Sequence, residues 1–228
     1  MRPPRRLAPG MASRFDLLVF DWDGTLVDSA AHIVSSLQAA CRELDLPVPS
    51  DQSARHVIGL GLHDSIRYIL PDVPQSRYAQ VAERYSAHYL AREHDVGLFP
   101  MVEEGLAHLD AAGHLLAVAT GKSRRGLDRV LTAFGMRERF IATRCADEGF
   151  PKPHPQMLEA LMAAVGVRAE RTLMIGDTTH DLLMAANAGA GAVAVSYGAH
   201  PQEQLAGLSP LACVPSFPDL LQWLEDNA

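Results

Sequence analysis

Apolar and polar positions along this chain are grouped in blocks that predict strands and helices in turn. Residues 17–20, LLVF, form a short continuous apolar run of the kind found in a central parallel strand covered on both faces. The predicted strands are residues 15–20, 115–119, 140–143, 172–175, 192–196 and 212–214. Segments with helical periodicity separate them. This alternation predicts βαβ units and therefore an α/β fold with a parallel sheet.

The connection between the first two predicted strands is too long for a single crossover. Residues 29–98 contain no convincing strand, whereas the segments SAAHIVSSLQAACREL, HDSIRYIL and QSRYAQVAERYSAHYLARE show helical periodicity. Because a crossover needs about a dozen residues, we interpret residues 29–98 as a small helical cap. Residues 15–28 and 99–228 would form the core. Both joints would lie beside Asp21 and Asp23, where a movable lid is expected.

The size, charge and cysteine content of the chain limit which binding partners and which cellular location are expected. The chain has 228 residues, of which 48% are hydrophobic, and a net charge of −7. This size predicts a globular core, and this charge argues against nucleic acid or an anionic membrane as partner. Three widely spaced cysteines without a CxxC pair indicate a reducing, cytoplasmic location. Residues 1–14 are predicted to be a disordered tail, or an extension before a natural start at Met11. No apolar run reaches membrane-spanning length. The oligomeric state stays open.

Polar side chains occur near the ends of several predicted strands. The segments that carry them are LLVFDWDGT, LLAVATGKS, GFPKPHP and LMIGDTTHD. Taken singly, each polar residue would be explained as a helix cap or a turn residue. Parallel strands, however, deliver such residues to one edge of the sheet, where ligands bind in open α/β folds. The sequence therefore predicts one site formed by Asp21, Asp23, Thr120, Lys152, Asp177 and Asp181.

These motifs together resemble those of the haloacid dehalogenase-like phosphohydrolases. DWDGT is similar to the first family motif, Thr120 to the second, Lys152 to the third and GDTTHD to the fourth. The resemblance covers nearly the whole chain after Met11, and the cap position and KPHP segment are most similar to the phosphoglycolate phosphatase branch. It implies a Rossmann-like core with a helical cap and a magnesium-dependent phosphatase acting on a small phosphorylated metabolite. Phosphoglycolate is the leading candidate, and pyrophosphate, nucleotides, sugar phosphates and a phosphomutase reaction remain open.

The resemblance implies a role for each residue of the four motifs. Asp21 would attack phosphorus and become an aspartyl-phosphate. Asp23 would protonate the departing alkoxide and later take a proton from the hydrolytic water. Thr120 would donate to a phosphoryl oxygen, and Lys152 would offset the charge on Asp21 and on the phosphate.

Magnesium prefers oxygen ligands. The expected ligands are the carboxylates of Asp21 and Asp177 and the main-chain carbonyl of Asp23, with Asp181 acting through water. Further substrate contacts are expected from Gly24, Thr25 and Gly121 in the core and from Gly59, His63 and Arg67 in the cap. His63 and Arg67 lie one helical turn apart, and a solvated helix face is the alternative explanation for them.

Other motif interpretations conflict with the residues present. A calcium loop would need Gly and Glu where Leu26 and His32 stand, and a nucleotide P-loop would need Gly where Leu116 stands. A true dehalogenase is expected to lack Asp23, and the related sugar phosphate mutases carry His where Ile33 stands. A receiver-like phospho-acceptor would need only about half of this chain. A measurement of phosphate release in the presence of magnesium would distinguish an enzyme from that alternative and from a plain metal-binding module.

Overall fold

A parallel sheet forms the centre of the computed structural model, which describes residues 14–228. The strand order is β3-β2-β1-β4-β5-β6, and each neighbouring pair is parallel. β1 therefore lies inside the sheet, between β2 and β4. The predicted α/β fold is confirmed. Residues 1–13 of the predicted tail lie outside the described residues. The strands are β1 (Leu17–Phe20), β2 (Leu115–Thr120), β3 (Ala142–Cys145), β4 (Thr172–Gly176), β5 (Gly191–Val195) and β6 (Ala212–Val214).

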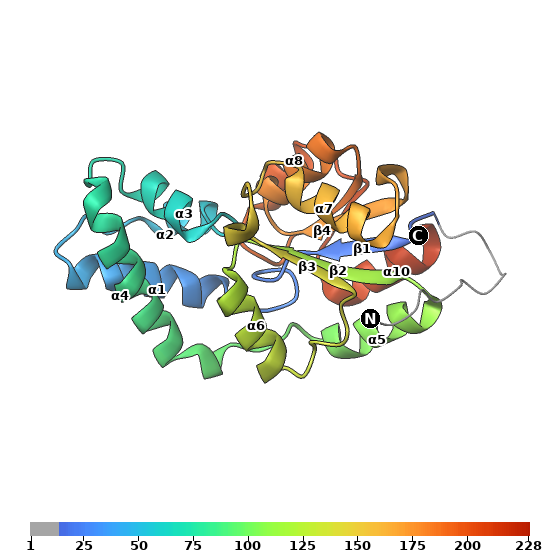
Figure 1. Ribbon diagram of the computed structural model, residues 1–228, viewed down its shortest axis with the longest axis horizontal. Coiled ribbons are helices and arrows are strands. Elements are labelled where there is room, and N and C mark those ends of the chain that lie inside the picture. Colours follow the sequence, from blue (N-terminus) through green and yellow to red (C-terminus); the bar gives the residue numbers. More distant parts are fainter. Residues whose placement is uncertain (1–13) are drawn as a thin grey trace.

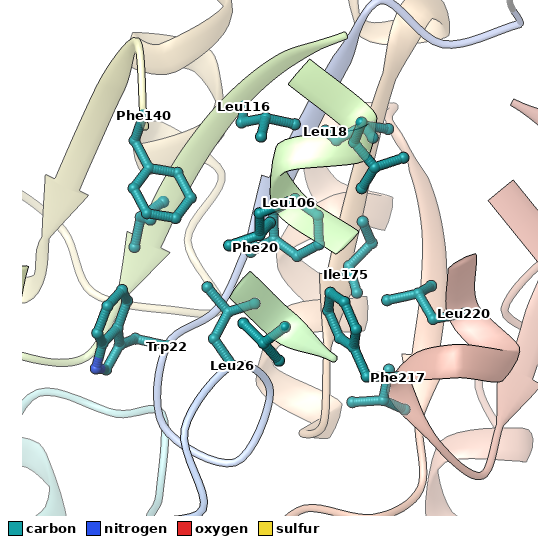
Figure 2. Packing of buried hydrophobic residues seen from close by; sticks show 14 of the residues in the cluster. Leu18, Phe20, Trp22, Leu26, Leu106, Leu116, Phe140, Ile175, Phe217 and Leu220 are labelled. Atoms are coloured by element: carbon teal, nitrogen blue, oxygen red, sulfur yellow. The ribbon is translucent and has the colours of Figure 1, made fainter. Parts of the chain in front are cut away.

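Helices cover both faces of this sheet (Figure 1). Side chains of a strand alternate between faces, so Phe20 packs with Leu106 of α5 and Phe217 of α10 on one face, as Figure 2 shows. Val19 packs on the other face with Leu158 of α7. The core helices thus cover both faces of the sheet, and they leave the carboxyl ends of its strands uncovered. The core helices are α5 (Val102–Ala112), α6 (Arg124–Ala133), α7 (Gln156–Val165), α8 (Thr179–Ala188), α9 (Gln202–Ala206) and α10 (Phe217–Asn227).

Four further helices follow β1 in the sequence and precede α5 and β2, and they extend from one end of the sheet (Figure 1). They are α1 (Ala30–Glu43), α2 (Asp51–His56), α3 (Leu62–Ile69) and α4 (Tyr78–Ala91), and we call them the helical insertion. Buried side chains such as Leu37 and Val57 form apolar clusters within it. Its two connections to the core run side by side, because Val27 bridges to Leu98 and the Asp28 N–H donates to the Gly97 carbonyl at 3.0 Å. Its interpretation as a cap with boundaries at 29 and 98 stays a prediction.

The structure differs from the sequence-based expectations at one helix, α2, and at one strand, β3. α2 has only six residues, too few for a helical periodicity to be recognised, so the sequence does not predict it. β3 was expected at residues 140–143 but is Ala142–Cys145. Phe140 contributes to the apolar pattern because it packs in the core beside Trp22, with ring centroids 6.3 Å apart, and not because it belongs to the strand.

The remaining regular elements are short. Single 3₁₀ turns occur at η1 (Gln75–Arg77), η2 (Glu93–Asp95), η3 (Ala146–Glu148) and η4 (Ala169–Arg171). Among residues 14–228, no helix has the length and apolar character needed to cross a membrane.

Candidate active site

Three buried aspartates meet beyond the carboxyl ends of β1 and β4. Asp21 follows β1 directly, Asp177 follows β4, and Asp181 lies in the first turn of α8. All three are fully buried, and one carboxylate oxygen from each lies within 4.8 Å of the others. Because β1 and β4 are adjacent parallel strands, the fold brings the first and fourth motifs together, as the positions of these residues at strand ends predict.

Lys152 lies among these carboxylates. Its Nζ donates to Asp21 Oδ1 at 2.8 Å and to Asp181 Oδ1 at 2.6 Å, and its side chain is fully buried. Burial alone would lower the pKa of this lysine, but the charges of Asp181 and Asp21 raise it above its ordinary value. Lys152 therefore stays protonated and holds two of the three carboxylates.

Asp177 is held by the first motif and by a backbone amide. The Thr25 hydroxyl donates to Asp177 Oδ1 at 2.8 Å, and the Ala199 N–H donates to Oδ2 at 2.7 Å. Gly24 has a φ of +83°, and a Cβ at this position would overlap the Asp177 carboxylate. The structure thus places Gly24 and Thr25 against Asp177. Their predicted contact with substrate stays a prediction.

The acidic cluster has the charge and the donor atoms that suit a divalent cation. Asp21 Oδ2 is buried and has no hydrogen-bond partner within residues 14–228. Burial raises the pKa of Asp21 well above its usual range, and the charges of Asp181 and Asp177 add to this effect against the opposing effect of Lys152. Burial and the Asp181 charge also raise the pKa of Asp177 to about 7. Magnesium would neutralise this excess charge through the oxygen ligands that it prefers, so the residues fit the ion.

Asp23 has a separate set of partners, although it is only two residues from Asp21. Its Oδ1 accepts from the Ser29 hydroxyl at 2.7 Å and forms an ion pair with Lys122 Nζ at 3.0 Å. Lys122 is not among the residues predicted from the sequence, because its GKS segment resembles part of a nucleotide P-loop that the rest of the segment does not complete. The available signal was its position two residues after Thr120, at the same edge of the sheet.

The second motif lies where the core packs closely against the helical insertion. Thr120 is the buried last residue of β2, and its Oγ1 accepts from the Lys122 N–H at 3.2 Å. A Cβ at Gly121 would lie only 2.5 Å from the carbonyl oxygens of Gly59 and Leu60 in the insertion. Gly121 therefore permits a close backbone contact between the two parts. Its predicted role in substrate binding stays a prediction.

A cleft of about 670 Å³ lies between the helical insertion and the core. Asp23, Lys122 and Arg125 line its core side, and two predicted substrate contacts, Gly59 and His63, line it from the insertion. Arg125 was not among the predicted site residues. The cleft therefore combines cationic groups with apolar surface, the latter supplied by Ile33, Leu37, Val57, Ile58, Leu60 and Leu90.

Arg67 lies elsewhere. It is exposed, forms an ion pair with Asp64 Oδ1 at 2.7 Å, and borders a second hollow in the surface that Lys152 also borders. His63 and Arg67 therefore line different hollows, although they are one turn apart on α3. The predicted substrate contact of Arg67 stays a prediction.

Comparison with known proteins identifies the family. Residues 18–195 match the family model of the haloacid dehalogenase-like hydrolases. The chain belongs to this family. It is 40% identical over 212 residues to the "Probable phosphatase IndB" of Dickeya dadantii (strain 3937), a match that covers 90% of this chain and 91% of that protein. It is 33% identical over 223 residues to the phosphoglycolate phosphatase of Mannheimia succiniciproducens, covering 93% of this chain and 99% of that one.

A solved structure has a similar fold over nearly the whole chain. The crystal structure of a predicted phosphoglycolate phosphatase from Haemophilus somnus 129pt superposes with a TM-score of 0.82 at 27% identity, over 93% of this chain and 99% of that chain. The resemblance to the phosphoglycolate phosphatase-like branch is thus confirmed, as is the prediction of a phosphatase.

Proposed function

We propose that this haloacid dehalogenase-like hydrolase is a magnesium-dependent phosphatase of small soluble phosphomonoesters, acting through an aspartyl-phosphate, with phosphoglycolate as the leading candidate substrate. The observation that carries the proposal is the contact of Lys152 with both Asp21 and Asp181 inside a buried acidic cluster. Such a cluster supplies a nucleophile, a fixed cation and oxygen ligands at one point, which is what phosphoryl transfer requires.

Asp21 would be the nucleophile. Its Oδ1 is held by Lys152, whereas Oδ2 has no hydrogen-bond partner within the described residues. A new bond between an Asp21 carboxylate oxygen and phosphorus would form as the bond to the leaving-group oxygen breaks. Lys152 would offset the charge of the aspartyl-phosphate. The Thr120 oxygen already accepts from the Lys122 N–H, so the Thr120 hydroxyl can direct its hydrogen to a phosphoryl oxygen.

Asp23 would serve as the acid and then as the base. It borders the cleft, where the leaving group would lie. Because Asp23 Oδ1 accepts from Ser29 and is paired with Lys122, the acid form would carry its proton on Oδ2 and give that proton to the departing alkoxide. It would then take a proton from the water that attacks phosphorus, which releases phosphate and regenerates the Asp21 carboxylate. The loop between Asp21 and Asp23 would thus place the nucleophile in the acidic cluster and the acid at the cleft.

Magnesium would be held by the carboxylates of Asp21 and Asp177 and by the main-chain carbonyl of Asp23, with Asp181 acting through water. When bound, it would supply positive charge that offsets the repulsion between the phosphoryl oxygens and the nucleophile. Asp177 is already oriented for such a role by Thr25 and Ala199.

Phosphoglycolate is the leading substrate for two reasons. A relative that is 33% identical over nearly its whole length is a phosphoglycolate phosphatase, and the cleft carries Arg125, whose guanidinium suits a carboxylate. Larger phosphomonoesters, including nucleotide and sugar phosphates, are the second candidate class. The cleft of about 670 Å³ with apolar walls favours them, because pockets of this size bury molecules much larger than glycolate.

The test is phosphate release from a panel of esters in the presence and absence of magnesium, with kcat/KM measured for each ester. Phosphoglycolate should give the highest value, and chelation should abolish turnover of every substrate. A higher kcat/KM for a nucleotide or sugar phosphate would move the assignment to the second class. Metal-independent turnover, or retention of activity by Asp21→Asn, would refute the proposed mechanism.

A further inference from the structure

Lys122 forms contacts with three groups from two parts of the molecule. Its Nζ lies 3.0 Å from Asp23 Oδ1, 3.2 Å from the Tyr89 hydroxyl oxygen and 4.9 Å from the centre of the Tyr89 ring. Asp23 belongs to the loop after β1, Lys122 to the loop after β2, and Tyr89 to α4 of the helical insertion. One ammonium therefore touches both the catalytic loop and the insertion.

This arrangement holds the lysine in place and keeps it charged. The Lys122 side chain is only 11% exposed and that of Asp23 only 10%, so water provides little stabilisation to either charge. Burial alone would lower the pKa of Lys122, but Asp23 and Tyr89 raise it above its ordinary value. A buried ammonium is costly without its partners. Movement of the insertion that withdraws Tyr89 would remove one of these partners and leave the ammonium held by Asp23 alone.

A second ion pair between the core and the end of the insertion provides a natural comparison. Arg129 of α6 donates through two nitrogens to the carboxylate of Glu93, which follows α4, with both distances 2.8 Å. This pair also ties the insertion to the core. Arg129 differs from Lys122 because no hydrogen bond or ion pair joins it to Asp23 within the described residues.

We propose that Lys122 is a positioning residue that couples the docking of the helical insertion to the orientation of Asp23. The proposal rests on the proposed function, because it takes Asp23 as the acid that protonates the leaving group. The Lys122 ammonium keeps the Asp23 carboxyl group at the cleft while its contact with Tyr89 holds α4 over the same point. The acid is then correctly placed only when the insertion is docked.

The proposal predicts a loss that depends on the leaving group. Lys122→Met keeps the length of the side chain but removes its charge, so kcat/KM should fall by about 10²-fold for alkyl phosphates, which need an acid. For an activated aryl phosphate the loss should be much smaller. Lys122→Arg should restore part of the alkyl activity, and Tyr89→Phe, which keeps the ring, should give a weaker loss of the same kind. The Lys122 and Tyr89 effects should not be additive, because the two residues share one contact.

The matched control is Arg129→Met. Both Lys122→Met and Arg129→Met should speed amide hydrogen exchange in α4, because each removes a link between the insertion and the core. Only Lys122→Met should change the ratio of alkyl to aryl kcat/KM. If that ratio is the same as in the unmodified protein, or if α4 exchanges no faster in Lys122→Met, the inference is wrong.

Asp23→Asn, measured in the same series, separates this inference from the proposed function. If Asp23→Asn loses alkyl activity selectively and Lys122→Met does not, only the role of Lys122 fails. If Asp23→Asn affects both classes of ester equally, the assignment of Asp23 as the acid fails, and the coupling inferred for Lys122 fails with it.

Discussion

Replacing Gly121 with alanine should push the helical insertion away from the catalytic loops. The added Cβ would lie 2.5 Å from the carbonyl oxygens of Gly59 and Leu60, whereas ordinary contacts begin at 3.4 Å, so the two backbones must separate by about 0.9 Å. Neither oxygen belongs to a side chain that could rotate away. A displacement of about 1 Å at a reacting centre can lower the rate by about 10²-fold, and we expect a loss of this size in kcat/KM for alkyl phosphates.

Three measurements test this prediction on Gly121→Ala. Steady-state kinetics with alkyl and aryl phosphates should show the larger loss for alkyl esters, which need the acid at the cleft. Hydrogen exchange should be faster in α4. Urea unfolding should show a decrease of about 1–3 kcal/mol in the free energy of unfolding, the usual cost of overpacking.

Gly207→Ala is the matched control. Gly207 lies at the end of α9 with a φ of −60°, and a Cβ there would lie 3.5 Å from its nearest neighbours. This substitution should leave kinetics and α4 exchange unchanged. Wild-type kcat/KM for all esters in Gly121→Ala would refute the argument that this backbone contact sets the position of the insertion.

Three further predictions concern the cluster and the cleft. Asp21→Asn should remain folded and lower kcat by about 10⁴-fold or more, as the loss of a covalent catalyst does, with circular dichroism confirming the fold. Magnesium should raise the Tm of the unmodified protein, because it binds only the folded state, and Asp177→Asn should abolish most of this rise in a thermal shift assay. His63→Ala should change the ranking of substrates by kcat/KM, because His63 lines the cleft, and the same measurement on Arg67→Ala tests the predicted substrate contact of Arg67, which is exposed and paired with Asp64.

The parts of the site that lie on the sheet could be predicted from the sequence. Asp21 and Asp177 each follow an apolar run, and the rule that parallel strands present their carboxyl ends at one edge is enough to bring them together. The sequence also assigns Lys152 to this edge, although no strand ends immediately before it, and the resemblance to the family supports the same position. The structure supplies the distances that join it to Asp21 and Asp181.

The parts of the site that depend on the helical insertion could not be predicted in this way. Periodicity indicates which face of a helix is apolar, but it does not say how one group of helices is oriented against a sheet. The contact of Gly121 with Gly59 and the separation of His63 from Arg67 both follow from that orientation. The contact between Lys122 and Tyr89 joins residues 33 positions apart, and no local pattern links them.

Two different lysines are paired with Asp21 and Asp23, the two aspartates that we propose to be catalytic, and they hold these aspartates in separate environments. Asp21 is paired with Lys152 among fully buried carboxylates, whereas Asp23 is paired with Lys122 at the edge of the cleft. A nucleophile must stay ionised, and in the proposed mechanism Lys152 and a metal ion would keep it so without any help from the insertion. An acid must instead meet the oxygen of a leaving group whose shape varies between substrates. Holding that acid through a lysine that also touches α4 would make its placement depend on how the insertion is docked, so that the position of the insertion and the proposed proton transfer would be linked at one ammonium.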